Sequence, residues 1–512
     1  MQESNQALLI KGGRVYDHGG DTDQPPFADI LITGDRIDRI GPDITEELAV
    51  EARGARIIDA SDRLIVPGFV NAHYHSHDVL LKGCFETIPF YMWLLNALPP
   101  QYPKRSLEEV RARTLLGAAE CLHGGITTLQ DMLTLNPIEP EYVDVVVDAY
   151  ESIGIRSVLS LQIADQKGID RVPFWRELVP EIYHAQLGSA AALSAEGSPV
   201  EMVREQYLRT PNPSSRVSWA LSPSSAILSS RSLLEGLEAL STEHSLPVLT
   251  HLYETRPEAL ASRQCLAEYG GSQVRYLESV GLLGPRLGLA HSVWLLPEEI
   301  QLLADTGTNV VLNPASNLKT KSGVAPIRAY IDAGVSIGLG CDNCSCSDVQ
   351  SMFQAMKLVS TLAANTDPEP GPPTARDAIH YATQGGARAL GLAGEVGALA
   401  PGMKADLSLL DLSRLSFVPL NSAARQIVFS ESGSAVHTVI VDGRVVLENR
   451  RLTQIDEVEL RAAVDLVSGP LRDDTAQVRA RFEKISPYIL EAWRRAWDED
   501  VGVYRYIGPQ RR

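Results

Sequence analysis

Residues 65–76 read IVPGFVNAHYHS, an apolar run followed by two histidines that are separated by one residue. The apolar stretch 64–70 has the composition of a buried strand in a parallel sheet. We expect His73 and His75 to lie just past its carboxyl end, where the backbone turns and where (β/α)₈ barrels hold their catalytic groups. A histidine pair alone is a weak signal, so its weight depends on the residues further along the chain.

Seven further segments have strand character, and segments with helical periodicity separate them. They are residues 125–132, 155–164, 216–223, 246–253, 286–293, 308–314 and 335–342. With the strand before His73 they make eight strand–helix units. This pattern predicts an α/β chain with a TIM-type (β/α)₈ barrel.

Both ends of the chain have a different pattern, because short strand-like segments with turn residues between them replace the strand–helix alternation. We expect residues 1–66 and 402–455 to form one small β-sandwich together. Residues 67–401 then form the barrel, and residues 456–512 form a helical extension.

Composition excludes several classes of partner. The net charge is −18, from 46 basic and 64 acidic residues. This balance argues against nucleic acid or an anionic membrane as the main partner. We find no signal peptide or apolar run that would span a bilayer, and the six cysteines do not form a disulfide framework. We expect a cytoplasmic enzyme with a small-molecule substrate, assembled as a homo-oligomer (dimer or tetramer).

Polar residues collect at the predicted strand ends. The first strand ends at His73 and His75, the fifth at His251 and Glu254, the sixth at His291 and the eighth at Asp342. In a closed barrel these ends meet at one mouth. Three imidazoles and one carboxylate suit Zn²⁺, or alternatively Fe²⁺, with one position open for water. The expected ligands are His73, His75, His251 and Asp342.

Each of these residues also has an ordinary structural interpretation. Asp342 could cap a helix that starts near residue 347, and Glu254 could favour the dipole of a helix's first turn. These interpretations do not explain why all the groups fall at strand ends. We assign no role at the site to the remaining histidines that lie in helical or loop contexts: His77, His123, His184, His244, His380 and His437.

Longer motifs extend through most of the chain. They are PGFVNAHYHS, LLKG with PFYMWL, GITTLQDM, THLYET, LAHSVWLLPEEI, LNPASNLKTKSG, GLGCDN and GALAPGMKADL. With these motifs the chain resembles the amidohydrolase superfamily. Its motifs are most similar to the cytosine deaminase-like branch, which holds methylthioadenosine/S-adenosylhomocysteine deaminases and s-triazine hydrolases. The resemblance implies a barrel with a β-sandwich and the metal ligands named above. It also implies catalytic roles for Glu254, His291 and Asp342.

The resemblance also bears on the number of metals. Binuclear members bridge their metals with a carboxylated Lys or a Glu from a middle strand. Here the third and fourth strands end in LQIADQK and ALSPSS, and Lys167 lies beyond the predicted strand end. We therefore expect one divalent metal per chain, with His291 facing the substrate.

The sequence departs from this family in two places. Pro223-Ser224 stands where nucleoside-type deaminases commonly have Pro-His, which argues against a nucleoside substrate. Gly340-Cys341-Asp342 replaces the usual Gly-Thr-Asp, and Cys344 and Cys346 follow. Such a cysteine cluster could bind a soft metal, but we favour a packing role, because no second cysteine group lies nearby.

The expected chemistry is attack of a metal-activated water on an sp² carbon, with Glu254 moving protons and His291 stabilising developing charge. Our first hypothesis is deamination of an aminated nitrogen heterocycle. Alternatives are hydrolysis of an amide, aryl urea, carbamate, N-alkylamine or chloro-heterocycle, or a relative without catalysis. Aromatic residues 90, 91, 93, 219 and 294 suggest a flat substrate. The expected substrate contacts are Trp93, Gln162, Ser224, Trp294 and Asn343.

Overall fold

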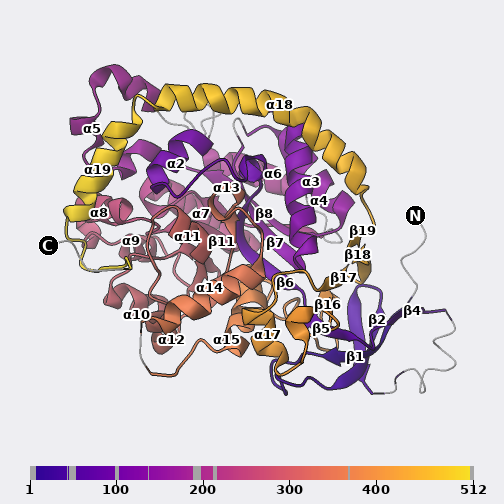
Figure 1. Cartoon of the computed structure of the whole chain (residues 1–512). Coiled ribbons are helices and arrows are strands. Elements are labelled where there is room, and N and C mark those ends of the chain that lie inside the picture. The colour runs from indigo at the N-terminus through magenta and orange to yellow at the C-terminus, as the bar shows by residue number, and fades with distance from the viewer. Residues whose placement is uncertain are drawn as a thin grey trace.

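The computed structural model describes residues 7–42, 44, 54–98, 103–135, 138–187, 198–210, 216–366 and 369–507. One nine-stranded sheet takes strands from both ends of the chain, and Figure 1 places it apart from the larger α/β part. Its strands are β1 (Leu8–Val15), β2 (Phe27–Thr33), β3 (Arg36–Gly41), β4 (Arg56–Asp59), β5 (Arg63–Pro67), β16 (Leu407–Asp411), β17 (Val436–Val441), β18 (Arg444–Glu448) and β19 (Arg451–Leu452).

The two ends of the chain join in this sheet where β5 pairs antiparallel with β16. Its order is β19-β18-β17-β16-β5-β1-β2-β3, with β4 beside β1. The sheet curls on itself. Arg36, at the start of the edge strand β3, pairs with Lys404, three residues before β16, so β3 returns toward the middle of the sheet. Apolar side chains from β1, β2, β5 and β16 meet in one buried cluster inside the curl. We predicted a small β-sandwich built from both ends of the chain; strands of both ends do lie in one sheet, and the backbone pairing is continuous through all nine strands.

Parallel strands form the centre of the larger part. They are β6 (Phe69–His75), β7 (Ile126–Leu133), β8 (Arg156–Ile163), β9 (Val217–Trp219), β10 (Ser222–Pro223), β11 (Val248–Leu252), β12 (Leu287–His291), β13 (Asn309–Leu312), β14 (Ser336–Leu339) and β15 (Asp342–Asn343). Nearly every residue in them is buried, as expected for strands that helices cover on the outside. The chain visits them in the predicted order.

We predicted one closed barrel sheet, and the described strands differ from this. They form a six-stranded sheet, β10-β8-β7-β6-β15 with β9 beside β8, and a four-stranded sheet, β11-β12-β13-β14. Isolated bridges link the two sheets where Leu221 pairs with Val248 and Ser225 with His251. On the other side, β15 follows β14 in the chain and pairs with β6.

The first predicted strand also needs a correction. Residues 64–70 divide between two sheets, because β5 ends at Pro67 and β6 begins at Phe69. Only glycine fits at position 68, where the chain crosses from one sheet to the other. A Cβ there would clash with the Thr127 hydroxyl oxygen at 2.1 Å. His73 and His75 lie inside β6 rather than beyond a strand end. Residues i and i+2 of a strand point to the same face, so both rings reach one site without a turn.

Helices cover the outside of the parallel strands (Figure 1). They are η1 (Ser76–Leu81), α2 (Phe90–Ala97), α3 (Leu107–His123), α4 (Pro140–Ile153), η2 (Gly168–Arg171), α5 (Trp175–Leu178), η3 (Glu181–Leu187), α6 (Pro199–Arg209), η4 (Ala226–Leu228), α7 (Arg231–His244), α8 (Arg256–Cys265), η5 (Ala267–Tyr269), α9 (Gln273–Ser279), α10 (Pro297–Thr306), α11 (Pro314–Lys319), α12 (Ile327–Ala333), α13 (Cys344–Ser347), α14 (Met352–Ala364), α15 (Ala375–His380), η6 (Tyr381–Gly385) and α16 (Gly386–Ala389). Ser106 and Ser230 cap α3 and α7 by accepting a backbone N–H, which explains where these helices begin.

The remaining helices come after the barrel in sequence. They are η7 (Leu415–Phe417), α17 (Ala423–Phe429), α18 (Glu457–Phe482) and α19 (Ser486–Asp498). In Figure 1, α18 runs in yellow along the top of the molecule and α19 descends beside α5 and α8. Both belong to a hydrophobic cluster that also includes α2. In the part of the chain that the structure describes, no helix combines the length and apolar surface needed to cross a bilayer.

Candidate active site

The structure brings together the six polar residues that we expected at one mouth. His73 and His75 come from β6, His251 from β11 and His291 from β12. Asp342 begins β15, and Glu254 comes two residues after β11. All six side chains are buried, and the most exposed, His251, has only 8% of its surface accessible. Such burial of imidazoles and carboxylates together requires a partner that compensates their polarity.

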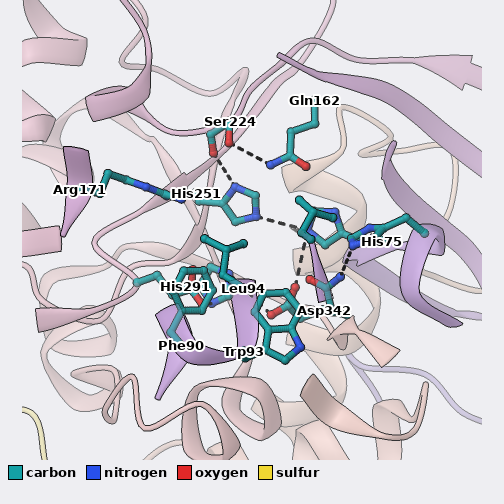
Figure 2. A pocket seen from close by; sticks show the side chains of 14 residues that line it. His75, Phe90, Trp93, Leu94, Gln162, Arg171, Ser224, His251, His291 and Asp342 are labelled. Atoms are coloured by element: carbon teal, nitrogen blue, oxygen red, sulfur yellow. Dashed lines mark hydrogen bonds and ion pairs between the residues drawn. The ribbon is translucent and has the colours of Figure 1, made fainter. Parts of the chain in front are cut away.

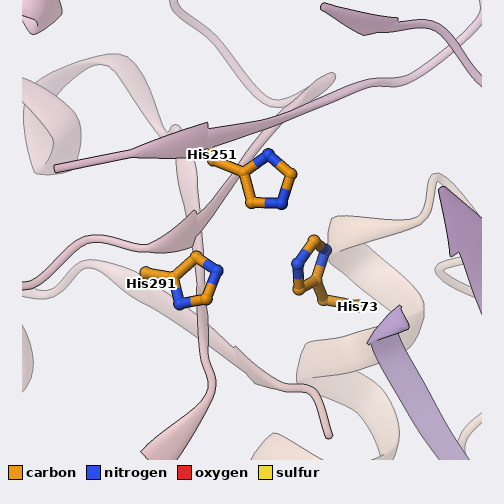
Figure 3. Close-up of side chains that lie close together, drawn as sticks. All are labelled: His73, His251 and His291. Atoms are coloured by element: carbon orange, nitrogen blue, oxygen red, sulfur yellow. The ribbon is translucent and has the colours of Figure 1, made fainter. Parts of the chain in front are cut away.

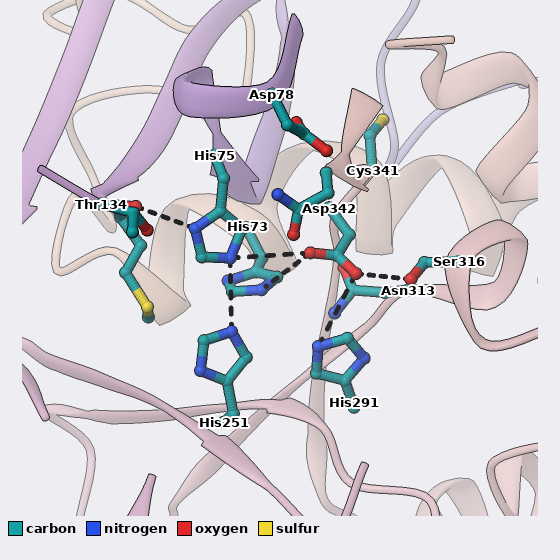
Figure 4. A network of polar contacts seen from close by, with 12 residues as sticks. His73, His75, Asp78, Thr134, His251, His291, Asn313, Ser316, Cys341 and Asp342 are labelled. Carbon is teal, nitrogen blue, oxygen red and sulfur yellow. Dashed lines mark hydrogen bonds and ion pairs between the residues drawn. The ribbon is translucent and has the colours of Figure 1, made fainter. Parts of the chain in front are cut away.

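The ring nitrogens and carboxylate oxygens converge on one small volume (Figure 4). Asp342 Oδ1 lies 3.5 Å from His73 Nε2 and 3.6 Å from His75 Nε2. His75 Nε2 lies 3.3 Å from His251 Nε2. The rings of His73, His251 and His291 also face one another, and their ligand atoms lie within 4.8 Å of each other (Figure 3).

Hydrogen bonds to backbone carbonyls set the tautomers of two of these rings. His75 Nδ1 lies 2.8 Å from the Met132 carbonyl oxygen, and His251 Nδ1 lies 2.5 Å from that of Ser224. A carbonyl oxygen only accepts, so each Nδ1 carries the proton and each Nε2 presents a lone pair. Two lone pairs 3.3 Å apart repel unless a cation lies beside them. Carbonyl-oriented histidines of this kind are typical of metal ligands.

Buried polar atoms without a protein partner also indicate that this cluster binds a ligand. In the described structure, His73 Nε2 and Glu254 Oε1 have no hydrogen-bond partner. An unpaired buried polar group costs free energy, so such atoms normally face a ligand. The residues His73, His75, His251 and Asp342 therefore fit a divalent metal, and their nitrogen and oxygen donors suit Zn²⁺.

Local backbone geometry aims two of these side chains. Asp342 and His291 have φ angles of 61° and 67°, in the left-handed region that L residues seldom occupy. Gly340 approaches the site closely, because a Cβ there would lie 2.7 Å from His73 Cβ. The Ser316 hydroxyl donates to Asp342 Oδ2 and fixes the carboxylate. Unusual backbone of this kind collects at functional sites, where the surrounding packing maintains it.

Burial and neighbouring charges separate the proton affinities of the two carboxyl groups. Burial raises the pKa of Glu254 to about 8, although His291 opposes the shift. Burial acts against ionisation of Asp342 too, but His291 and His73 hold the pKa of Asp342 well below its usual range. Two carboxyl groups with such different pKa values can act as a proton donor and an anion in the same site.

His291 occupies the space between these two carboxyl groups. Its Nε2 lies 3.8 Å from Asp342 Oδ2, and its Nδ1 lies 3.9 Å from Glu254 Oε1. Asn317 Oδ1 lies 2.8 Å from His291 Nδ1 and orients the ring. Burial opposes the charged form, but the two carboxyl groups outweigh it and raise the pKa of His291. His291 is therefore suited to interact with negative charge that develops on a substrate.

A pocket of about 50 Å³ opens onto this cluster (Figure 2). Four of the five predicted substrate contacts line it, namely Trp93, Gln162, Ser224 and Asn343. The fifth, Trp294, does not: it is fully buried, and its indole N–H donates to the Ser322 carbonyl oxygen at 2.7 Å. Its place just past β12 suggested a contact, but the ring turns away from the pocket to pack on Tyr506.

Some pocket residues were missing from the sequence prediction. His77 lines the pocket and lies near Asn343, although we assigned it no role. Arg171, at the end of η2, also lines the pocket, and its Nε has no partner in the described structure. Arg171 lies on a one-turn helix after β8, where no periodicity or strand end marks a residue. The adjacent HYHSH sequence was the only signal for His77.

No carboxylate or lysine stands where a bridging ligand would be expected. The ends of β8 and β10 present Gln162 and Ser224 to the pocket, and Lys167 is exposed. The buried cysteines Cys341, Cys344 and Cys346 are free thiols, and burial raises the pKa of each. Among the described residues, no potential metal-binding group contains a cysteine.

Comparison with known proteins extends over most of the chain. The model of the amidohydrolase family matches residues 64–446. A 5-methylthioadenosine/S-adenosylhomocysteine deaminase from Thermococcus kodakarensis is 32% identical over 441 residues, which cover 86% of this chain and 94% of that protein. A 5′-deoxyadenosine deaminase from Methanothermobacter thermautotrophicus is 31% identical, with 88% of this chain and 96% of that protein covered.

Solved structures with a similar fold contain zinc. An adenosine deaminase from Xanthomonas campestris with bound zinc has a TM-score of 0.76 and 27% identity, covering 91% of this chain and 98% of that one. An atrazine chlorohydrolase from Arthrobacter aurescens, complexed with zinc, also has a TM-score of 0.76, at 26% identity. It covers 90% of this chain and all of that one.

Proposed function

This chain belongs to the amidohydrolase family, and from that premise we propose that it deaminates an aminated nitrogen heterocycle and releases ammonia. It is a hydrolase of C–N bonds. One observation carries the proposal: Glu254, a buried carboxyl group with a raised pKa and an unpaired oxygen, lies beside a cluster of buried histidines and Asp342 that could hold a metal ion. The names of the similar deaminases support the same reaction.

His73, His75, His251 and Asp342 would hold one divalent metal, for which we propose Zn²⁺ with Fe²⁺ as the alternative. The cation supplies the charge that brings the pKa of a water molecule toward neutrality. A single ion is proposed because Gln162 and Ser224 replace the bridging ligand that a binuclear site needs. Without such a residue between two cations, their mutual repulsion would be poorly compensated.

The protein's own groups move the protons. Ionised Asp342 takes the proton that the attacking water loses, and protonated Glu254 gives its proton to the ring nitrogen of the substrate. His291 stabilises negative charge on the substrate as the new C–O bond forms. Asp342 then returns the proton to the amine, the C–N bond breaks, and ammonia leaves. The added hydroxyl group becomes the product carbonyl as it gives its proton to ionised Glu254, which restores both carboxyl groups.

The pocket favours a compact and planar substrate. Aromatic rings of Phe90 and Trp93 line it, together with Leu94 and Leu98. We propose Trp93, Gln162, Ser224 and Asn343 as substrate contacts. Ser224 offers a neutral hydroxyl where nucleoside-type relatives commonly have histidine, so we expect poor turnover of methylthioadenosine and S-adenosylhomocysteine. The proposed loss is one orienting contact, about 1–3 kcal/mol.

The test is a substrate screen of the zinc-loaded protein. Heterocyclic amines, adenosine derivatives, aryl ureas and chlorotriazines are compared, and the release of ammonia, organic amine and chloride is measured. Ammonia from a compact heterocyclic amine is the expected result. Release of chloride or an organic amine, without ammonia from any substrate, would overturn the proposal. A homo-oligomeric assembly and a cytoplasmic location stay predictions.

A further inference from the structure

The Ser224 side chain occupies a constrained position in the pocket wall. Ser224 comes directly after β10, and its backbone carbonyl accepts from His251 Nδ1, so the residue is held against the metal site. The side chain is buried and lines the pocket. In Figure 2, Ser224 and Gln162 point toward one another beside His251. The hydroxyl can therefore meet a substrate next to the proposed reaction centre.

Two distances decide which way the hydrogen bonds run through Gln162. Thr134 Oγ1 lies 2.5 Å from one terminal atom of Gln162, and Ser224 Oγ lies 2.9 Å from the other. A separation of 2.5 Å falls within the range of O–H···O bonds and below that of N–H···O bonds, whereas 2.9 Å is typical of N–H···O. The amide oxygen therefore faces Thr134, and the amide nitrogen donates to Ser224.

This direction leaves one proton unused. Ser224 Oγ accepts from Gln162, so its own O–H cannot also donate to that amide. Among the described residues, no atom accepts a hydrogen bond from the Ser224 hydroxyl. A histidine at this position could donate or accept according to its tautomer, whereas this serine is fixed as a donor by Gln162 and Thr134.

We propose that the Ser224 hydroxyl is a hydrogen-bond donor that selects substrates with an acceptor atom, a ring nitrogen or a carbonyl oxygen, beside His251. The inference rests on the proposed function, because it assumes that the pocket binds a heterocycle. Gln162 and Thr134 act as positioning residues that set the polarity of the hydroxyl. A substrate with C–H at that place would leave the donor unpaired in a buried site.

A series of planar probes tests this selection in binding, independently of turnover. The probes are 2-amino-1,3,5-triazine, 2-aminopyrimidine, 2-aminopyridine and aniline, which lose one ring nitrogen at each step and keep the same outline. Dissociation constants are measured by calorimetry on zinc-loaded wild type, Ser224→Ala and Gln162→Glu. Ser222→Ala is the matched control, because its hydroxyl donates to Ser160 and does not line the pocket.

We expect one step of the series to weaken binding by about 3- to 10-fold more in the wild type and in Ser222→Ala than in Ser224→Ala. In Gln162→Glu the carboxylate accepts the proton of the Ser224 hydroxyl, and the hydroxyl then turns a lone pair toward the ligand. Removing the same ring nitrogen should therefore no longer cause the extra loss of binding. Equal penalties at every step in the wild type and in Ser224→Ala would overturn the inference.

The experiment separates this inference from the function on which it rests. If no amine releases ammonia but the Ser224-dependent step is present, the donor assignment stands and the proposed deamination fails. If ammonia is released and no step depends on Ser224, deamination stands and the donor assignment is wrong. Equal zinc content in the wild type, Ser224→Ala, Ser222→Ala and Gln162→Glu shows that a changed metal site is not the cause.

Discussion

Glu254 is the residue on which the proposed chemistry depends most. It is buried, its pKa is raised to about 8, and its Oε1 has no partner in the described structure. A carboxyl group in this state is protonated at neutral pH and available to a substrate. This combination distinguishes it from Asp342, which faces the histidines and stays ionised.

Replacing Glu254 with Gln should abolish turnover while the metal stays bound. Glutamine keeps the size and polarity of the side chain but cannot transfer a proton, which typically contributes about 10²–10⁴-fold. The measurement is kcat together with zinc content. The matched comparison is His251→Ala, which should lose metal and activity together. Near-normal kcat in Glu254→Gln would show that another group carries the proton.

We expect the proposed metal ligands to make the metal-free protein sensitive to acid. Burial lowers the pKa of His75 to about 4, against about 6.5 in an unfolded chain. As the pH falls below about 6.5, the unfolded chain binds the proton first, so the free energy of unfolding decreases until the pH reaches about 4. For His75 alone the loss between about pH 7 and about pH 5 is about 2 kcal/mol.

Urea unfolding of chelator-treated protein at the two pH values measures this loss. The variant His75→Gln removes the titrating group, so its stability should fall by about 2 kcal/mol less over the same interval. An identical pH dependence in the wild type and in His75→Gln would contradict the assignment of a buried, neutral imidazole.

At the residue scale, the site was predictable where a strand end marked it. Strand ends share one edge of a parallel sheet, so the order of His73, His251, His291 and Asp342 in the sequence already placed them together. Arg171 and Trp294 were not predictable in this way. Whether a side chain just beyond a strand turns into the pocket or away from it depends on turn geometry, and a strand pattern carries no information about that.

At the scale of elements, one buried carboxyl group joins two segments of the site. Asp78 in η1 accepts the backbone N–H groups of Cys344 and Ser345, each at 3.0 Å, and the Ser345 hydroxyl. The same hydroxyl oxygen accepts from Trp93 Nε1 at 2.7 Å. Asp78 thereby ties the segment after His75 to the segment after Asp342 and fixes a ring of the pocket wall.

Replacing Asp78 with Asn should weaken both the fold and the metal site. An amide keeps one oxygen acceptor but places N–H donors against the backbone N–H of residue 344 or of residue 345, and an unpaired buried group costs about 1–3 kcal/mol. Misplacement of Asp342 should weaken zinc binding by about 10- to 100-fold. Thermal unfolding and a competitive zinc titration check this. The exposed Asp62→Asn is the control, and an Asp78→Asn variant that matches it would refute the connection.

The strand boundary at Pro67-Gly68 shows what sequence patterns miss at this scale. Residues 64–70 read as one apolar run, and although Pro67-Gly68 marks a break in it, the dipeptide does not say that the chain passes from the curled sheet to the parallel sheet. The passage depends on close approach to Thr127, a residue distant in the sequence. Local composition was enough to predict the existence and order of the strands. The position of this boundary depends on a tertiary contact, so local composition could not predict it.

At the scale of the whole molecule, the C-terminal helices support the pocket from outside. A separate hydrophobic cluster joins α18 and α19 to α2, whose Phe90 and Trp93 line the pocket. Trp493 of α19 is buried in it, with its ring centroid 5.9 Å from that of Tyr91. Helices such as α18 and α19 were predictable from the sequence in this part of the chain, but their contact with the pocket wall was not.

Replacing Trp493 with Ala should destabilise the protein by about 3–5 kcal/mol and loosen α2. We expect KM to rise more than kcat falls, because α2 lines the pocket and carries none of the proposed metal ligands. Trp497→Ala is the control, since Trp497 lies only partly buried against the same cluster and stacks on Tyr506 at 3.6 Å. Equal KM values in the two variants would show that α19 does not support the pocket.

The central claim is a single catalytic metal at His73, His75, His251 and Asp342. The most direct measurement is the metal content of the purified protein, determined by elemental analysis during zinc titration of the chelator-treated enzyme and combined with ammonia release from the best substrate. We predict that activity returns in proportion to zinc and stops rising at one ion per chain. Activity that requires two ions per chain, or that is complete without any, would contradict the account.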